Sequence, residues 1–370
     1  MDESRQPAFA GVLLATVLLL PAASAQAVRA PSGGPPAVTE RDMSAPSGGP
    51  PAVPERDAAD PSGGSAAGTP IPPGLDRLID RGSVVRIRRS LPDGTLLDVM
   101  ALGADGTVLG GSQVVDSAGF THLRRGVWRA RPGERGARLL RDTGKPWSLW
   151  RMATGASGHL WPWGERLRCL DQHGRRAVRS LPGWTGRTFF FSGRLLVWEA
   201  EGGRLMTARG CAGRPRTLPA RGTLVAFSHP HAFLLRKDRL LRVNVRTGGS
   251  AEARGLPLPP ARAESIAAGP GLLAFADRTA LRVVDRRTGR PYAPVEDLPR
   301  RGAADFGAGV SAGERIVVYS VRHLDRDVSQ SLVYDPRTAR TVALPGEAMV
   351  TGNRLLWRDG DHYLLARVRP

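Results

Sequence analysis

The feature that most constrains the fold is a recurring pattern of short apolar runs separated by turns. One run, LLVWEA, spans Leu195–Ala200, and similar runs follow one another at regular spacing to the end of the chain. Apolar runs of this length between turn residues are typical of buried strands. In chain order, the runs that we expect to be equivalent strands are Thr107–Ser112, His159–Gly164, Arg194–Ala200, His231–Lys237, Leu272–Ala276, Glu314–Ser320 and Arg354–Arg358.

The spacing of these runs predicts a repeat architecture. Their starts differ by 52, 35, 37, 41, 42 and 40 residues, and the first interval is the widest because of an insertion over Gly111–Gly126. A period of about 40 residues is that of a four-stranded β-propeller blade. We therefore predict an all-β fold, a seven-bladed β-propeller over residues 76–370. A six-bladed closure would follow if the unit Gly186–Ala220 were irregular.

The two ends of this repeat region complement each other. The last unit, Glu347–Pro370, supplies only about three strands, whereas Ser83–Arg89 (SVVRIRR) has strand character and precedes the first complete unit. We expect Ser83–Arg89 to be the outer strand of the last blade. This pairing would remove an open sheet edge, so the C-terminal segment should be indispensable.

The first 25 residues have the pattern of a secretory signal peptide. Gly11–Leu20 is apolar, Pro21 interrupts it, and Ala23-Ser24-Ala25 is a small-x-small cleavage site. The acidic Asp2 and Glu3 are unusual in such a segment, and an uncleaved anchor is the alternative. We expect a secreted or envelope-associated protein.

Residues 26–75 have the composition of a disordered linker. The sequence APSGGPPAVTERD at Ala30–Asp42 is repeated as APSGGPPAVPERD at Ala45–Asp57, and a truncated copy starts at Asp60. A segment so rich in Pro, Gly, Ser and Ala cannot bury a core. The linker is either an extended tether or a simple repeat expansion without a selected role.

Charge and cysteine content limit the function classes. The net charge is +19, and all basic residues except Lys145 and Lys237 are arginine, which GC-rich coding or attraction to an anionic surface would each explain. No basic–aromatic ladder indicates nucleic-acid binding. Cys169 and Cys211 could form one disulfide in an exported protein or remain two thiols, and their spacing does not suggest zinc or redox chemistry.

The clearest local motif is a turn. It occurs as NVRTG at Asn244–Gly248, LRVVDRRTG at Leu281–Gly289 and DPRTA at Asp335–Ala339. The Asp or Asn side chain can accept backbone N–H bonds two residues on, and Gly allows the left-handed closing residue. Through these turns and strands, Ser83–Pro370 resembles the β-propeller superfamily of WD-type, TolB-like and quinoprotein-like repeats, which implies the fold and no functional residues.

Four tryptophans lie on the expected strands. Trp161, Trp163, Trp198 and Trp357 could form an aromatic ligand platform, but filling the space between twisted sheets is the better interpretation.

Candidate ligand residues are few. His229 and His231 share one face of an extended segment, yet no third metal ligand is nearby, and a turn with two solvated histidines explains them better. The only candidate ligand patch is His323, Asp325 and Asp327, in a loop after the second strand of the sixth unit; surface ion pairs with neighbouring arginines are the alternative. The insertion carrying Asp116 and His122 should emerge on the same face.

No catalytic motif and no cofactor site is recognisable. We therefore predict an exported, non-catalytic binding or protein-interaction scaffold, expected to be monomeric, with an unknown protein or envelope component as its partner. The alternatives are a propeller enzyme, a lyase or hydrolase, with residues gathered at the channel mouth, and an envelope-adhering protein held by its arginine charge.

Overall fold

The computed structural model describes most of the chain from Ile71 onward. The predicted signal peptide and most of the predicted linker lie outside the described residues. So do residues 115–122, 145–146, 149–150, 164–165, 173–178, 254–255, 257–262, 300–304 and 324–327.

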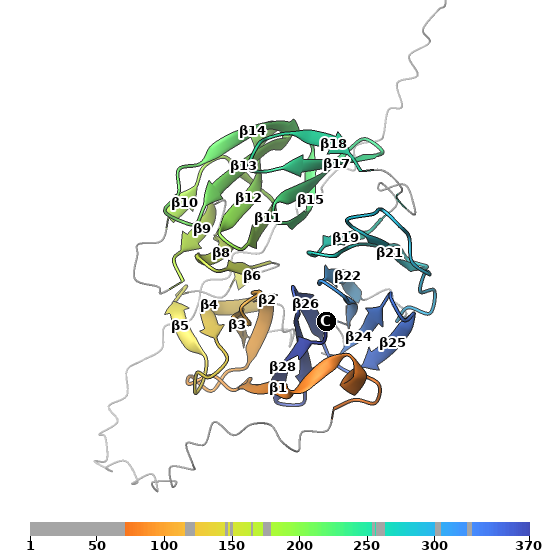
Figure 1. The fold of residues 1–370 in the computed structure, drawn as a ribbon. Coiled ribbons are helices and arrows are strands. Elements are labelled where there is room, and N and C mark those ends of the chain that lie inside the picture. The colour runs from red at the N-terminus through yellow and green to blue at the C-terminus, as the bar shows by residue number, and fades with distance from the viewer. Residues whose placement is uncertain are drawn as a thin grey trace, which may run out of the picture. The chain divides into compact units, whose positions relative to one another are not determined.

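In the described part, the strands form seven antiparallel sheets (Figure 1), which we number I to VII. Sheet I contains β2 (Leu97–Leu102), β3 (Val108–Val114), β4 (Leu123–Ala130) and β5 (Arg138–Arg141), with β6 (Trp147–Ser148) beside β4. Sheet II contains β7 (Ala153–Gly155), β8 (Gly158–Trp163), β9 (Arg166–Leu170) and β10 (Arg179–Leu181). Sheet III contains β11 (Trp184–Ser192), β12 (Leu195–Ala200), β13 (Arg204–Arg209) and β14 (Arg216–Arg221).

The remaining four sheets continue the pattern. Sheet IV contains β15 (Thr223–Ser228), β16 (His231–Arg236), β17 (Arg239–Asn244) and β18 (Ser250–Glu252), and sheet V contains β19 (Ser265–Ala268), β20 (Leu272–Ala276) and β21 (Leu281–Asp285). Sheet VI contains β22 (Asp305–Ala312), β23 (Val317–His323), β24 (Val328–Asp335) and β25 (Arg340–Leu344). Sheet VII contains β26 (Ala348–Thr351), β27 (Arg354–Asp359), β28 (His362–Val368) and β1 (Ile79–Arg88). Two short 3₁₀ helices cover Leu75–Arg77 and Glu201–Gly203.

The seven predicted strands coincide with the second strand of each sheet, from β3 to β27. Three details differ from the sequence-based prediction. β23 begins at Val317 rather than Glu314, and both ends of the expected insertion Gly111–Gly126 belong to β3 and β4. The unit expected to be weakest, Gly186–Ala220, lies in the complete four-stranded sheet III, whereas sheet V is the three-stranded one.

The first strand of the domain pairs with the last. β1 is antiparallel to β28, with Val85 opposite Leu365 and Ile87 opposite Tyr363. The Ser83 hydroxyl accepts a hydrogen bond from the backbone N–H of Arg367 at 2.8 Å. Sheet VII therefore takes one strand from the beginning of the domain and three from its end.

The hydrophobic core is divided among the sheet interfaces. Each of its seven clusters combines residues from two neighbouring sheets: VII with VI, VII with I, I with II, II with III, III with IV, IV with V, and V with VI. Trp161, Trp198 and Trp357 are essentially inaccessible at 0%, 0% and 1% exposure, and Trp163 packs against the cluster between sheets I and II. The packing interpretation of these tryptophans is confirmed.

The innermost strands contact one another in sequence. β2 contacts β7, and the series continues through β11, β15, β19, β22 and β26, which again contacts β2. Figure 1 shows these strands pointing toward the middle of the domain, with the outer strands at its rim.

The predicted turn chemistry is present in all three copies. Asn244 Oδ1 accepts the N–H groups of residues 246 and 247, and Asp285 Oδ1 accepts those of residues 287 and 288. Asp335 Oδ1 accepts the N–H of residue 337. The closing residues Gly248, Gly289 and Ala339 have φ of 83°, 75° and 52°. An alanine therefore occupies a left-handed position that favours glycine.

Cys169 and Cys211 are joined by a disulfide, with their Cα atoms 5.4 Å apart. Cys169 lies in β9 of sheet II, and Cys211 follows β13 of sheet III, so the bond links two neighbouring sheets.

Among the described residues, no helix is long and apolar enough to span a membrane.

Deleting residues 362–370 should prevent folding. The deletion removes Tyr363, Leu364 and Leu365, which are at most 1% exposed, and leaves β1 unpaired. Their burial contributes about 6–9 kcal/mol, comparable with the entire stability of a domain. Deleting only residues 369–370 should cost about 1–2 kcal/mol, since it removes the carbonyls that accept bonds from Arg315. Circular dichroism of both variants tests this, and a native spectrum for the longer deletion would contradict it.

Replacing Ala339 with glycine should raise the free energy of unfolding by about 0.5–1 kcal/mol, because the left-handed backbone strains alanine. The reciprocal change Gly289→Ala, at the equivalent turn position, should lower it by about 1 kcal/mol. Denaturant unfolding of the two variants measures both effects. If both substitutions changed the free energy of unfolding in the same direction, the left-handed closing residue would not control the stability of these turns.

Candidate functional site

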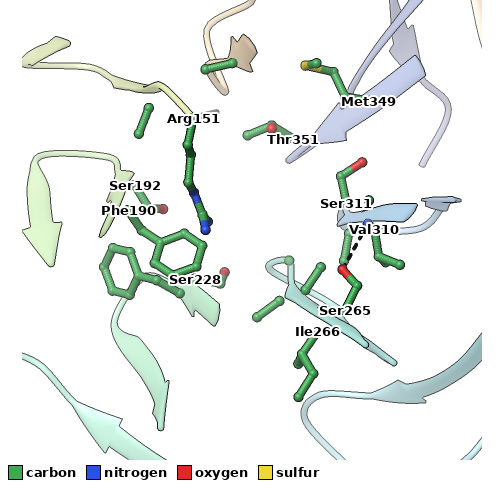
Figure 2. A pocket seen from close by; sticks show the side chains of 18 of the residues that line it. Arg151, Phe190, Ser192, Ser228, Ser265, Ile266, Val310, Ser311, Met349 and Thr351 are labelled. Atoms are coloured by element: carbon green, nitrogen blue, oxygen red, sulfur yellow. Dashed lines mark hydrogen bonds between the residues drawn. The ribbon is translucent and has the colours of Figure 1, made fainter. Parts of the chain in front are cut away.

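A cavity of about 710 Å³ lies where the inner strands meet, and all seven sheets contribute to its lining. Most of the lining consists of small or apolar residues and hydroxyls, including Met349, Ile266 and Val310 on one side and Phe190 on the other (Figure 2). This volume is within the range of pockets that hold small molecules or short chain segments. The inner strands are thus the walls of a candidate ligand site.

Arg151 supplies a cation in this cavity. It directly precedes β7, and Figure 2 shows its side chain extending into the cavity toward Phe190. The guanidinium carbon is 4.1 Å from the centroid of the Phe190 ring and 5.9 Å from that of Phe189, close enough for cation–π attraction. Within the described part of the chain, the guanidinium has neither an ion pair nor a hydrogen bond.

Desolvation acts strongly on this cation. Burial lowers the pKa of the Arg151 guanidinium to about 10, so the group remains protonated at pH 7. Keeping this cation in the cavity therefore costs desolvation free energy. Among the described residues, the rings of Phe189 and Phe190 offset part of that cost. A cation held in this way is available to an anion that enters the cavity.

Two carboxylates also belong to the lining. The Glu264 carboxylate is paired with Arg278 at 2.8 Å, and Glu347 lies just before β26. The described lining contains no His, Cys, Tyr or Asp. Its polar groups are thus the Arg151 guanidinium, these two carboxylates and several Ser and Thr hydroxyls.

Several lining hydroxyls hold neighbouring sheets together. The Ser265 hydroxyl accepts a bond from the Val310 N–H at 3.3 Å, drawn in Figure 2, and the Ser311 hydroxyl accepts one from the Val350 N–H at 3.0 Å. Each bond joins the inner strand of one sheet to the inner strand of the next. These serines stabilise the cavity wall, and two further serines, Ser192 and Ser228, lie on the side of Arg151 and Phe190.

No described candidate residue from the sequence lines this cavity. His323 ends β23, whereas Asp325 and Asp327 lie outside the described residues, as do Asp116 and His122. Among the residues that are described, no three His, Cys, Asp or Glu side chains are grouped to hold a metal ion. The ligand patch His323, Asp325 and Asp327 stays a prediction.

His229 and His231 lie at the turn between β15 and β16 and are partly buried. Burial first, and then the charge of nearby Arg286, lowers the pKa of both histidines, and Arg246 further lowers that of His229. Arg286 Nη2 is 3.0 Å from His231 Nδ1. The two imidazoles thus lie among arginines rather than among other metal ligands.

Comparisons with known proteins found only distant similarities to solved structures. No protein family matches the chain, and no curated protein matches it. Similar solved structures include human WBSCR16, at 9% identity and TM-score 0.46, covering 75% of this chain and 88% of that one. PorZ of Porphyromonas gingivalis, an essential surface component of the type-IX secretion system, is 11% identical with a TM-score of 0.47. The match covers 75% of this chain and 39% of PorZ. BamB from Moraxella catarrhalis is 12% identical with a TM-score of 0.44, and the match covers 78% of this chain and 90% of BamB.

The likeness to these solved structures is one of overall fold alone. The chain spans well under half of the length of PorZ. The identities are too low to transfer any activity.

The substitution Arg151→Met should increase the free energy of unfolding by about 1 kcal/mol, because it removes a desolvated cation while keeping a similar apolar stem. The control Arg278→Met breaks an ion pair whose arginine is 86% exposed and should change stability by less than about 0.5 kcal/mol. Thermal and denaturant unfolding measure both variants. A destabilisation by Arg151→Met would mean that the guanidinium has a structural role.

Proposed function

We propose that this protein is an exported, non-catalytic binding module: a closed seven-bladed propeller whose central cavity holds an acidic segment of a partner protein. The observation that carries the proposal is the Arg151 guanidinium, stacked on Phe190 and unpaired in the described part of a cavity lined by all seven sheets. The seven sheets, the contacts between successive inner strands and the β1–β28 pairing support closure.

The choice of an anionic group follows from the chemistry of Arg151. A guanidinium presents several N–H donors in a planar fork that matches a carboxylate. The guanidinium carbon lies 4.1 Å from the centroid of the Phe190 ring, and no described group accepts a hydrogen bond from the guanidinium, so its N–H donors are available to a ligand. An incoming carboxylate would neutralise the Arg151 cation, which no described carboxylate of this chain pairs with.

The choice of an extended peptide follows from the sheet order. The innermost strand of each sheet is paired on one side only, so its other edge faces the cavity. An extended segment can form main-chain hydrogen bonds with such edges while its side chains enter apolar positions. Met349, Ile266 and Val310 provide apolar positions opposite Arg151.

Export is supported by the cysteines as well as by the signal-like N-terminus. The Cys169–Cys211 pair is joined in the structure, and disulfides persist mainly in oxidising compartments outside the cytoplasm. A binding role fits the described lining, which holds one cation without an ion pair among mostly small and apolar side chains.

Selection of random heptapeptides on the full chain tests the proposal. Wild-type protein should enrich peptides with Asp or Glu, and Arg151→Met should lose this enrichment, because the cation that selects the carboxylate is gone. Arg340→Met, which changes an exposed arginine of sheet VI outside the cavity, is the matched control and should behave like wild type.

The best peptide and its Asp→Asn or Glu→Gln form should then be compared by calorimetry. We expect at least a 10-fold weaker affinity from the peptide change with the wild type and little effect with Arg151→Met, which is the signature of direct pairing. Enrichment without acidic residues, or full binding by Arg151→Met, would exclude the proposal.

A further inference from the structure

A second cavity, of about 610 Å³, lies at the turns where sheet III meets sheet IV. Its lining comes from the β11–β12 turn, the β13–β14 turn, His229 in the β15–β16 turn and the segment after β17. We call it the arginine groove. Its lining residues are Gly193, Arg194, Leu195, Thr207, Ala208, Arg209, Arg214, Arg216, His229, Val245 and Arg246.

The groove is strongly cationic. Five of its eleven lining residues are arginines, and none is Asp or Glu. Arg194, Arg209, Arg214 and Arg246 are exposed, and no described carboxylate forms an ion pair with any of them. Their mutual repulsion is not offset locally, so the groove attracts anions.

The turns that carry these arginines are fixed in place. Arg216 Nη2 donates to the carbonyls of Val245 at 2.6 Å and Arg246 at 3.0 Å, which ties sheet III to sheet IV. Asn244 Oδ1 holds the turn of Arg246 through its N–H at 2.9 Å. The Cys169–Cys211 disulfide anchors the β13–β14 turn, which bears Arg214, to sheet II. The cationic groups are thus presented by a preorganised frame rather than by free loops.

The histidines follow the same electrostatics. Burial, and then the positive charges of Arg246 and Arg286, lowers the pKa of His229. A neutral imidazole can donate or accept a hydrogen bond, but the surrounding guanidinium groups repel a metal cation. His229, which lines the groove, can therefore share a hydrogen bond with a bound anion.

We infer that the arginine groove binds a ligand carrying several phosphate groups. Several guanidinium groups that line one cavity can share the oxygens of tetrahedral phosphates through paired N–H bonds. The volume accommodates a small ligand or a short stretch of a phosphate polymer, and the charge favours one with more than one phosphate. This site is separate from the central cavity and does not depend on the ligand proposed there.

Calorimetric titration of the full chain with tripolyphosphate tests the inference. Binding should weaken steeply with added salt, and the double variant Arg214→Gln/Arg246→Gln should lose at least 30-fold in affinity. The control Arg337→Gln/Arg340→Gln removes two exposed arginines from sheet VI, has the same net charge and should lose less than threefold. Unchanged melting temperatures would show that both double variants are folded.

Two further probes define the ligand class and its source. Citrate, with three carboxylates, should bind at least 10-fold more weakly than tripolyphosphate. Vesicles of phosphatidylglycerol, with phosphatidylcholine vesicles as the reference, test a lipid headgroup; binding that the groove variant abolishes assigns the phosphate to lipid, and no vesicle binding assigns it to a free or polymeric ligand. Equal affinity for citrate, or equal losses in the two double variants, would overturn the inference.

Discussion

Each sheet in this domain buries its faces against two neighbours, and every other feature depends on that arrangement. The seven hydrophobic clusters all lie between adjacent sheets, with a large aromatic ring such as Trp161, Trp198 or Trp357 in several of them. Stability is therefore distributed along a series of interfaces rather than held in one central core. The pairing of β1 with β28 matters because sheet VII contributes to two of these interfaces, with sheets VI and I.

In this arrangement, the residues that build the scaffold differ from those that line the two cavities. The repeated positions fill interfaces and close turns, as Asp285 and Asp335 do. Both proposed sites lie where single residues depart from the repeat. Arg151 places a cation in a cavity lined mostly by small, apolar and hydroxyl side chains, and the arginine groove gathers guanidinium groups without ion pairs from the ends of two sheets.

The sequence predicted the second strands because buried central strands have continuous apolar runs; β12, for example, is almost entirely buried. It predicted the turns because Asn and Asp bond their own backbone locally. Arg151 carried no such signal, since it is one of 51 arginines and becomes distinctive only when seven inner strands converge. The arginine groove was equally hidden, because Arg194 and Arg246 belong to different sheets and no local spacing links them.

The pairing of the first strand with the last in sheet VII also determines the order in which the domain can fold during synthesis. β1 leaves the ribosome or a translocation channel first, yet its partner β28 is the last strand to appear, so the domain cannot be completed during synthesis. The Cys169–Cys211 bond needs only sheets II and III and can form much earlier. A partly emerged chain would thus hold a covalently fixed arc of sheets while one apolar strand waits unpaired, which makes this interval the time when protection from aggregation is most needed.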